Sequence, residues 1–335
     1  MKTPNIQFIE NRKRFFTFTL ILIAVLFCVS LVRGYRLDIE FKGGSLVEYS
    51  FTGDLSANDA LNVLQKTMEK PINCQISKNL GDDAKKLVVS VAGSEPLTTE
   101  ELDQIGKVLE SSFPDKSLEL SNSLLVSPTM GREMLTNGLL ALAIASALIL
   151  LYVWFSFRKM SGPSAGCMAL VALLHDATLT FLAYVISGSA INETLIAVIL
   201  TILGFSINDT IVVYDRIREN MGIYGRSKSL DEIVNISLNQ SLSRTLMTSI
   251  CMFIAVVVAY GYALAFDLDS IKEFAFPILI GIMSGTYSSI VIAAPLWALW
   301  QKHKHQDQGP DASKVESQKK ASKTGAKTSS AGAKA

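Results

Sequence analysis

The apolar positions of this chain gather into six long runs, and most of the polar positions lie in one stretch between the first run and the second. A helix needs about 20 consecutive apolar residues to cross the hydrocarbon core of a bilayer, and each run approaches or exceeds that length. The pattern therefore predicts an integral membrane α-helical bundle of six transmembrane helices, with the second to the sixth inside residues 137–300. The predicted spans are residues 15–32, 138–157, 163–186, 195–213, 246–266 and 274–300.

The first apolar run follows directly on Arg12, Lys13 and Arg14. A secretory signal peptide also places basic residues before an apolar run, but a cleavage site with small residues should then follow. No such site precedes Arg33, so the first run is predicted to be an uncleaved transmembrane helix.

Lysines and arginines are divided unequally among the segments that join the runs. They occupy residues 1–14, the segments after the second and fourth runs, and the tail at 301–335, whereas the segments after the third and fifth runs hold only Lys272. Because basic residues stay on the cytoplasmic side, both termini are predicted to be cytoplasmic. Residues 33–136 then lie on the opposite side, which is the periplasm in a bacterium, and the lysine-rich tail is predicted to be disordered.

Residues 33–136 show strand and helix periodicities that indicate an independent α+β domain. Thr98 and Glu101 have the spacing of a capping box, which marks the start of one helix. The elements follow the order βαββαβ, which predicts a ferredoxin-like fold with two helices on one face of a four-stranded antiparallel sheet. The predicted elements are strands at 46–51, 72–77, 86–91 and 116–125 and helices at 56–70 and 98–110.

The overall composition excludes several classes of function. The net charge is +1, so no nucleic acid or other polyanion is expected as a partner. The four cysteines lack disulfide or metal spacing, and no P-loop, HExxH or GxSxG motif occurs. We therefore expect no cofactor, no metal and no enzymatic activity. The tail lysines could touch anionic lipid or ribosomal RNA, but a solvated tail is the simpler interpretation.

The fourth run carries polar residues where a span should be apolar. An aspartate at mid-membrane costs about 2.5–3.5 kcal/mol, so Asp209 needs a partner, a proton or water, and it is our candidate for reversible protonation. Asn208 shares a narrow helix face with Thr201 and Gly204, and the simpler interpretation is a contact between helices. The polar residues of this run are Ser206, Asn208, Asp209 and Thr210.

Arg244 stands near the start of the fifth run, after a second capping box formed by Ser229 and Glu232. A helix is predicted to start there, to lie at the cytoplasmic surface and to lead into the fifth span. Asp209 and Arg244 then both belong to the cytoplasmic half of the bilayer, and we expect a salt bridge between them that protonation of Asp209 releases. The alternative is an interfacial arginine that only marks orientation.

Two further intramembrane features depart from a lipid-like composition. His175 and Asp176 lie near the middle of the third run, so they either bond to a neighbouring helix or join a proton path. Gly281 and Gly285 in the last run have GxxxG spacing, for which close helix packing is the simpler interpretation.

Four segments stand out as motifs: SINDTIVVYDRIRE at 206–219, LNQSLSRTLMTS at 238–249, LHD at 174–176 and SPTMGRE at 127–133. Together they resemble the SecF family, the smaller subunits of the bacterial SecDF protein-export complex and members of the RND superfamily. The resemblance covers residues 10–300 and departs at few positions. Asp38, Glu40, Ser127 and Tyr214 replace the family's usual glycine, aspartate, glycine and phenylalanine, away from the expected charge pair.

The resemblance implies a subunit of the inner membrane that uses the proton-motive force to promote translocation of preproteins. Its implied partners are a SecD-like subunit, the SecYEG channel, YajC, YidC, the unfolded preprotein and membrane lipid. Six spans with one soluble domain also form half of an RND-like unit, so an obligate SecD-like partner is expected. Asp209 and Arg244 match family positions implicated in proton transport. The supporting intramembrane polar residues are Asn208, Thr210, Asp176 and His175.

Two other classes of function are compatible with the residues. One is RND-type proton-coupled efflux of small molecules, although one small soluble domain offers little of the apolar pocket that such a site needs. The other is a passive membrane scaffold or insertion factor, in which the charge pair only holds helices together.

Overall fold

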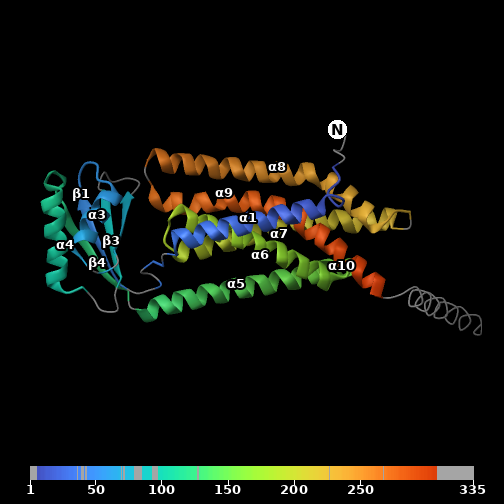
Figure 1. Ribbon diagram of the computed structural model, residues 1–335, viewed down its shortest axis with the longest axis horizontal. Coiled ribbons are helices and arrows are strands. Elements are labelled where there is room, and N and C mark those ends of the chain that lie inside the picture. The colour runs from blue at the N-terminus through green and yellow to red at the C-terminus, as the bar shows by residue number, and fades with distance from the viewer. Residues whose placement is uncertain are drawn as a thin grey trace, which may run out of the picture.

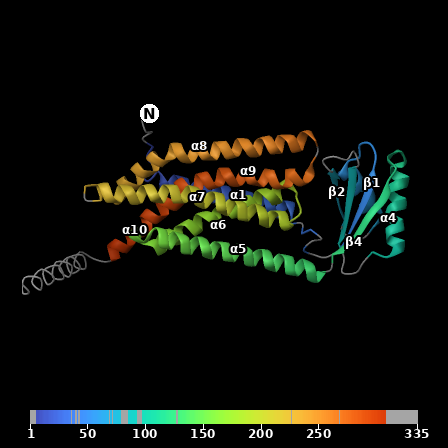
Figure 2. The ribbon, with the colours of Figure 1, turned by 180° about the vertical axis from the view of Figure 1, so that it is seen from behind.

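The computed structural model describes residues 6–307 apart from residues 36, 39–40, 42–43, 69, 71, 79–84, 93–96, 127, 226 and 267. Long helices run side by side along the molecule, and a small unit of sheet and helices stands at one end of the bundle (Figure 1). Viewed from behind, the N-terminus and α10 (Ala294–Asp307) lie at the other end (Figure 2). The molecule thus divides into a unit of sheet and helices at residues 44–126, named the soluble unit after its polar sequence, and a helical bundle.

Six helical segments of the described chain are long and apolar enough to cross a membrane, which confirms the six predicted spans. The sixth is composite, because α9 continues into α10. The helices are α1 Arg12–Arg33, α5 Pro128–Ser156, α6 Gly162–Ser187, α7 Glu193–Tyr224, α8 Leu230–Ala265, and α9 Asp269–Ser288 with α10.

The spans differ in how far other parts of the chain cover them. In α6, α7 and the last span, 56%, 44% and 72% of the most apolar stretch is buried, against 11%, 6% and 11% in α1, α5 and α8. Tyr214 of α7 and Trp297 of α10 fill the interior. Polar groups on α6, α7 and α9 are therefore shielded by protein, whereas α1, α5 and α8 present apolar surface outward.

The last span changes its helical form partway along. A π-helix at Ser289–Ala293 joins α9 to α10, and such turns, with their wider hydrogen-bond spacing, are frequent at functional sites. α10 ends at Asp307, later than the expected start of the tail at 301. Predicted disorder of the rest of the tail concerns residues 308–335, which lie outside the described residues, as do residues 1–5.

The predicted helix start at Ser229 is confirmed, and the surface helix and the fifth span form one continuous helix, α8. The Ser229 N–H donates to the Glu232 carboxylate at 2.9 Å, and the Glu232 N–H donates to the Ser229 hydroxyl at 3.3 Å. Buried positions recur in α8 as far as Ser249, whereas beyond it Ala263 is the one buried residue in the described part of the helix.

The beginning of α8 is tied to both ends of the described chain. The Ile6 N–H donates to Asn239 Oδ1 at 2.8 Å, and Asn239 Nδ2 donates to the Ile6 carbonyl at 2.9 Å. Asp231 of α8 pairs with Lys302 of α10 at 2.6 Å and lies 3.7 Å from Arg12 of α1. Three segments distant in sequence thus meet at the end of the bundle away from the sheet.

The soluble unit contains the predicted strands and helices in the predicted order. Its sheet has the strand order β2-β3-β1-β4, and each neighbouring pair is antiparallel. Val47 of β1 is fully buried against Leu64 of α3 and Leu109 of α4, and the capping box of Thr98 and Glu101 is confirmed. The elements are β1 Gly44–Phe51, α3 Ala57–Thr67, β2 Ile72–Lys78, β3 Lys85–Ala92, α4 Thr99–Ser112 and β4 Glu119–Val126.

A polar contact joins the soluble unit to the bundle. Gln75 of β2 donates from Nε2 to Oε1 of Glu273, near the start of α9, at 3.2 Å. Asn192, which caps α7, donates to the other carboxylate oxygen of Glu273 at 3.4 Å. The start of α9 therefore touches both the sheet and α7.

Candidate functional site

Close packing of α9 on α7 determines where the polar residues of the bundle meet. A Cβ atom added to Gly281 would lie 2.2 Å from Cδ1 of Ile202, and one added to Gly285 would lie 3.0 Å from Cβ of Ser206. Small residues at such positions let helix backbones approach closely. The predicted packing role of the two glycines is confirmed, and it brings the hydroxyl groups of α9 into the centre of the bundle.

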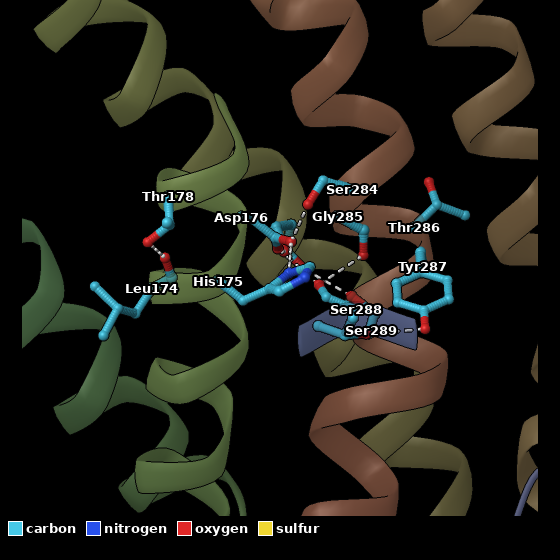
Figure 3. Close-up of polar contacts among 12 residues, drawn as sticks. Leu174, His175, Asp176, Thr178, Ser284, Gly285, Thr286, Tyr287, Ser288 and Ser289 are labelled. Atoms are coloured by element: carbon cyan, nitrogen blue, oxygen red, sulfur yellow. Dashed lines mark hydrogen bonds and ion pairs between the residues drawn. The ribbon is translucent and has the colours of Figure 1, made fainter. Parts of the chain in front are cut away.

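Asp176 of α6 lies among hydroxyl groups from two other helices (Figure 3). The residue is fully buried, and its Oδ2 accepts hydrogen bonds from Ser206 of α7 and Ser288 of α9, each at 2.6 Å. Its Oδ1 accepts a hydrogen bond from Ser284 of α9 at 2.6 Å and lies 2.9 Å from Nδ1 of His175. The carboxylate thus ties α6 to both α7 and α9.

These contacts offset the burial of Asp176. A hydrogen bond to an ionised group contributes about 1.5–3 kcal/mol, so three hydroxyl donors compensate a large part of the cost of holding the acid at this depth. Bonding to neighbouring helices, one of the two roles expected for Asp176, is what the contacts provide.

Asp209 of α7 belongs to a second hydrogen-bonded group, on a different side of α9. The residue is 1% exposed, and its Oδ2 accepts a hydrogen bond from the Ser249 hydroxyl of α8 at 3.2 Å. The Thr286 hydroxyl of α9 in turn donates to the Ser249 hydroxyl at 2.7 Å. Ser284 and Thr286 are two residues apart, about 200° around the helix, so the two acids approach α9 from different sides.

The predicted salt bridge between Asp209 and Arg244 does not form in this conformation. Both residues lie in the described part of the chain, and the ion pairs found there do not join them; Arg244 is exposed on α8. Ser249 faces Asp209 instead. It lies five residues beyond Arg244, which turns the helix by about 140° and advances it by about 7.5 Å. A hydroxyl group, not a guanidinium, therefore holds the acid.

The remaining predicted residues of the fourth span separate into a buried one and an exposed one. Thr210 is 1% exposed, and its hydroxyl lies 2.9 Å from that of Ser289 in the π-helix. Asn208 is exposed, together with Thr201 and Gly204 on the same face. The helix contact predicted for Asn208 is therefore not made within the described chain.

Sequence reasoning missed the hydroxyl groups that hold the two acids. Two of the four, Ser284 and Ser288, come from residues 284–289, which read SGTYSS inside an otherwise apolar run. That density of hydroxyl side chains is the signal that was present. Serine and threonine in a span commonly bond to their own helix backbone, so their partners depend on how the helices dock.

The described residues contain no cluster of three or more His, Cys, Asp or Glu side chains placed to hold a metal ion. Fold and site together define a class, a multi-pass helical membrane protein with an α+β unit between its first two spans and acids inside the bundle. The sequence profile described as "Protein export membrane protein SecD/SecF, C-terminal" matches residues 104–303. The chain belongs to this SecD/SecF family.

Relatives extend the match to almost the whole chain. Protein translocase subunit SecF of Petrotoga mobilis is 35% identical over 88% of this chain and 95% of its own length. Protein translocase subunit SecF of Rickettsia bellii is 30% identical over 90% of this chain and 95% of its own length.

Solved structures agree with the fold. The crystal structure of SecDF from Thermus thermophilus, described as a translocon-associated membrane protein, is 29% identical, covers 89% of this chain and has a TM-score of 0.71. SecDF in a super-membrane-facing form is 29% identical, covers 92% of this chain and has a TM-score of 0.67. The present chain spans 39% and 40% of those two SecDF chains.

Proposed function

We propose that this chain is a SecF-type subunit of a bacterial export complex and that it uses the proton-motive force to promote translocation of preproteins. Similarity to SecF translocase subunits over nearly the whole length supports the export role. The observation that carries proton coupling is Asp209, an acid 1% exposed in an apolar helix and bound to α8 through the Ser249 hydroxyl.

Protonation of Asp209 changes which group of α8 it attracts. The neutral acid needs no charged partner and keeps its contact with Ser249, whereas the ionised acid attracts the guanidinium of Arg244, about one and a half turns away along α8. To bring this guanidinium to the acid, α8 has to rotate or slide along α7. One proton that moves down 100 mV releases about 2.3 kcal/mol, which biases such a movement about fiftyfold.

The helix α9 links the acid to the soluble unit. It meets the Asp209 group through Thr286 and reaches β2 through the contact between Glu273 and Gln75. A displacement of α8 against α7 that disturbs Ser249 also disturbs α9, because Thr286 donates to the same hydroxyl. Proton binding in the bundle is thereby coupled to movement of the soluble unit.

We further propose that the soluble unit has a ferredoxin-like fold and lies in the periplasm. The order βαββαβ and the sheet order β2-β3-β1-β4 support a ferredoxin-like fold. The basic residues of the segments at the other end of the bundle support cytoplasmic termini, and hence a periplasmic soluble unit and an inner-membrane location.

The proposed partners follow from the size of the relatives and from the exposed faces of the bundle. Because the chain spans about two fifths of SecDF, a SecD-like subunit supplies the remainder. The exposed face at Asn208 is a surface for such a partner. The description of SecDF as translocon-associated supports a SecYEG channel as the next neighbour. YajC, YidC and the preprotein enter from the family resemblance, and lipid covers α1 and α5.

The test compares Asp209→Asn with Asp215→Asn, the same chemical change at an exposed site on the same helix. Both variants are assembled with the SecD-like partner, and preprotein translocation into vesicles is measured with and without a proton gradient. We expect Asp209→Asn to lose the part of translocation that the gradient adds, and Asp215→Asn to keep it. Translocation by Asp209→Asn that responds to the gradient as the wild type does would refute the proposal.

A further inference from the structure

His175 has an unusual position beside the buried acid of α6. It is 8% exposed, its Nδ1 lies 2.9 Å from Oδ1 of Asp176, and its Nε2 is buried without a hydrogen-bond partner in the described part of the chain. The ring lies between α6 and Tyr287 of α9, with the centroids of the two rings 6.4 Å apart (Figure 3). One nitrogen of the ring is thus occupied and the other is free inside the bundle.

The contacts of Asp176 assign the tautomer of this histidine. Three serine hydroxyls donate to the carboxylate, which arranges both of its oxygens as acceptors. An ionised carboxylate requires a donor at Nδ1, because a bare Nδ1 would direct its lone pair at an oxygen. The hydrogen bond therefore fixes the proton on Nδ1 and leaves the lone pair of Nε2 open, as with carboxylate-oriented histidines elsewhere.

The charge balance of the pair favours the uptake of one proton. With a neutral ring, the pair carries one net negative charge within the bundle, which is costly at this depth. A proton added to Nε2 makes the ring an imidazolium and the pair neutral overall. The contacts described for the ring place two titratable groups against it, Asp176 and Tyr287. The hydroxyl of Tyr287 is engaged with Thr19 and the Phe15 carbonyl of α1, and α7 presents Ser206.

We infer that the pair His175–Asp176 is a second proton-binding site of the bundle, separate from Asp209, and that the proton is held on Nε2 of His175. The proton comes from water and returns to it, so no other group is oxidised, reduced or transferred. That the protons drive export rests on the proposed function, but the existence of the site does not.

The position of this site gives it a mechanical consequence. Asp176 holds Ser288, which directly precedes the π-helix at Ser289–Ala293, and Ser284, about one turn earlier. An imidazolium at 2.9 Å draws charge from the carboxylate and weakens its hold on those two hydroxyls. The Asp209 group reaches the same helix through Thr286, so two proton-dependent contacts act on α9 from different sides.

The test is nitrogen-15 NMR of the full chain, assembled with its SecD-like partner in lipid nanodiscs and labelled in the histidine rings. The chain has three histidines, His175, His303 and His305, and the His175→Gln variant identifies the signal of the first. We expect His175 to show the neutral Nδ1–H tautomer at high pH and to convert to imidazolium when the pH is lowered. An Nε2–H tautomer, or a ring that stays neutral throughout, would overturn the inference.

Two variants separate this site from Asp209 and from a purely structural role. Asp176→Asn keeps the shape but removes the charge, so at a given pH we expect the protonated fraction of His175 to fall about tenfold. Tyr287→Phe, which removes a neighbouring hydroxyl, should leave the titration in place. If Asp209→Asn kept gradient-driven translocation while His175 still titrated, proton-driven export would fail and the site would stand. If His175 stayed neutral at every pH while Asp209→Asn lost gradient-driven translocation, the second proton site would fail and proton-driven export would stand.

Discussion

A single methyl group on Gly281 is predicted to loosen the core of the bundle. In Gly281→Ala the new Cβ would lie 2.2 Å from Cδ1 and 2.4 Å from Cγ1 of Ile202, whereas non-bonded carbon atoms settle about 3.5–4.0 Å apart. Ile202 is fully buried and β-branched, so it has to leave its rotamer or push α7 away from α9. Overpacking of this kind costs about 1–3 kcal/mol in the free energy of unfolding.

The matched control is Gly204→Ala on α7, where nothing lies within 4 Å of the added Cβ. The assay is reversible unfolding of the full chain in mixed micelles, followed by circular dichroism. We expect Gly281→Ala to lose about 1–3 kcal/mol and Gly204→Ala to lose nothing, since alanine favours a helix over glycine. Adding Ile202→Ala to Gly281→Ala should cost less than the sum of the two single changes, because the methyl group then has room.

The result that would refute the reasoning is equal stability of the two alanine variants within about 0.5 kcal/mol. The spacing of α7 and α9 would then not depend on the glycine contact. Additive losses in the double variant would likewise show that the strain does not come from Ile202.

Two further predictions concern the soluble unit. Burial raises the pKa of the Cys74 thiol to about 12, so about one thiol in ten thousand is ionised at pH 8. We expect maleimide to label Cys74, as measured by mass spectrometry, only when the sheet unfolds. Rapid labelling of Cys74 in the native chain would contradict its buried position. The hydrogen bond from Lys70, with that from the Thr98 N–H, lowers the pKa of Glu101. The ionised Glu101 therefore stabilises the folded state at pH values above its unfolded pKa of about 4.3, and this stabilisation is lost as the pH falls through its lower folded pKa. Hydrogen-exchange protection of residues 99–112 should then drop in acid in the wild type. An equal drop in Glu101→Gln would refute this.

Features that depend only on residues close together in the sequence were predictable. The lengths of the apolar runs gave all six spans, and the pairs Thr98 with Glu101 and Ser229 with Glu232 gave the starts of α4 and α8. Each of these signals acts within one helix, so packing between elements does not alter it.

Contacts between helices were predictable only in part. The depth of Asp209 and Asp176 identified both acids, because an ionisable group in an apolar run needs a partner wherever the helix docks. The partner itself depends on the rotation of the facing helix, and a difference of about 140° decides between Arg244 and Ser249. Likewise, the pattern shows that Thr201, Gly204 and Asn208 share a face, but not whether this chain or another covers it.

The long helix α8 is held at one end and extends without interruption to the other end of the bundle. It is anchored where Asn239 binds Ile6 and where Asp231 meets α1 and α10, and it continues unbroken past Ser249 to Ala265. Along the helix, Asn239 is about 15 Å from Ser249 and about 39 Å from that tip, so a tilt of about 5° at Asn239 moves Ser249 by about 1.3 Å and the tip by about 3.4 Å. A displacement beside the acid is thereby enlarged about two and a half times at the end of the bundle that bears the sheet.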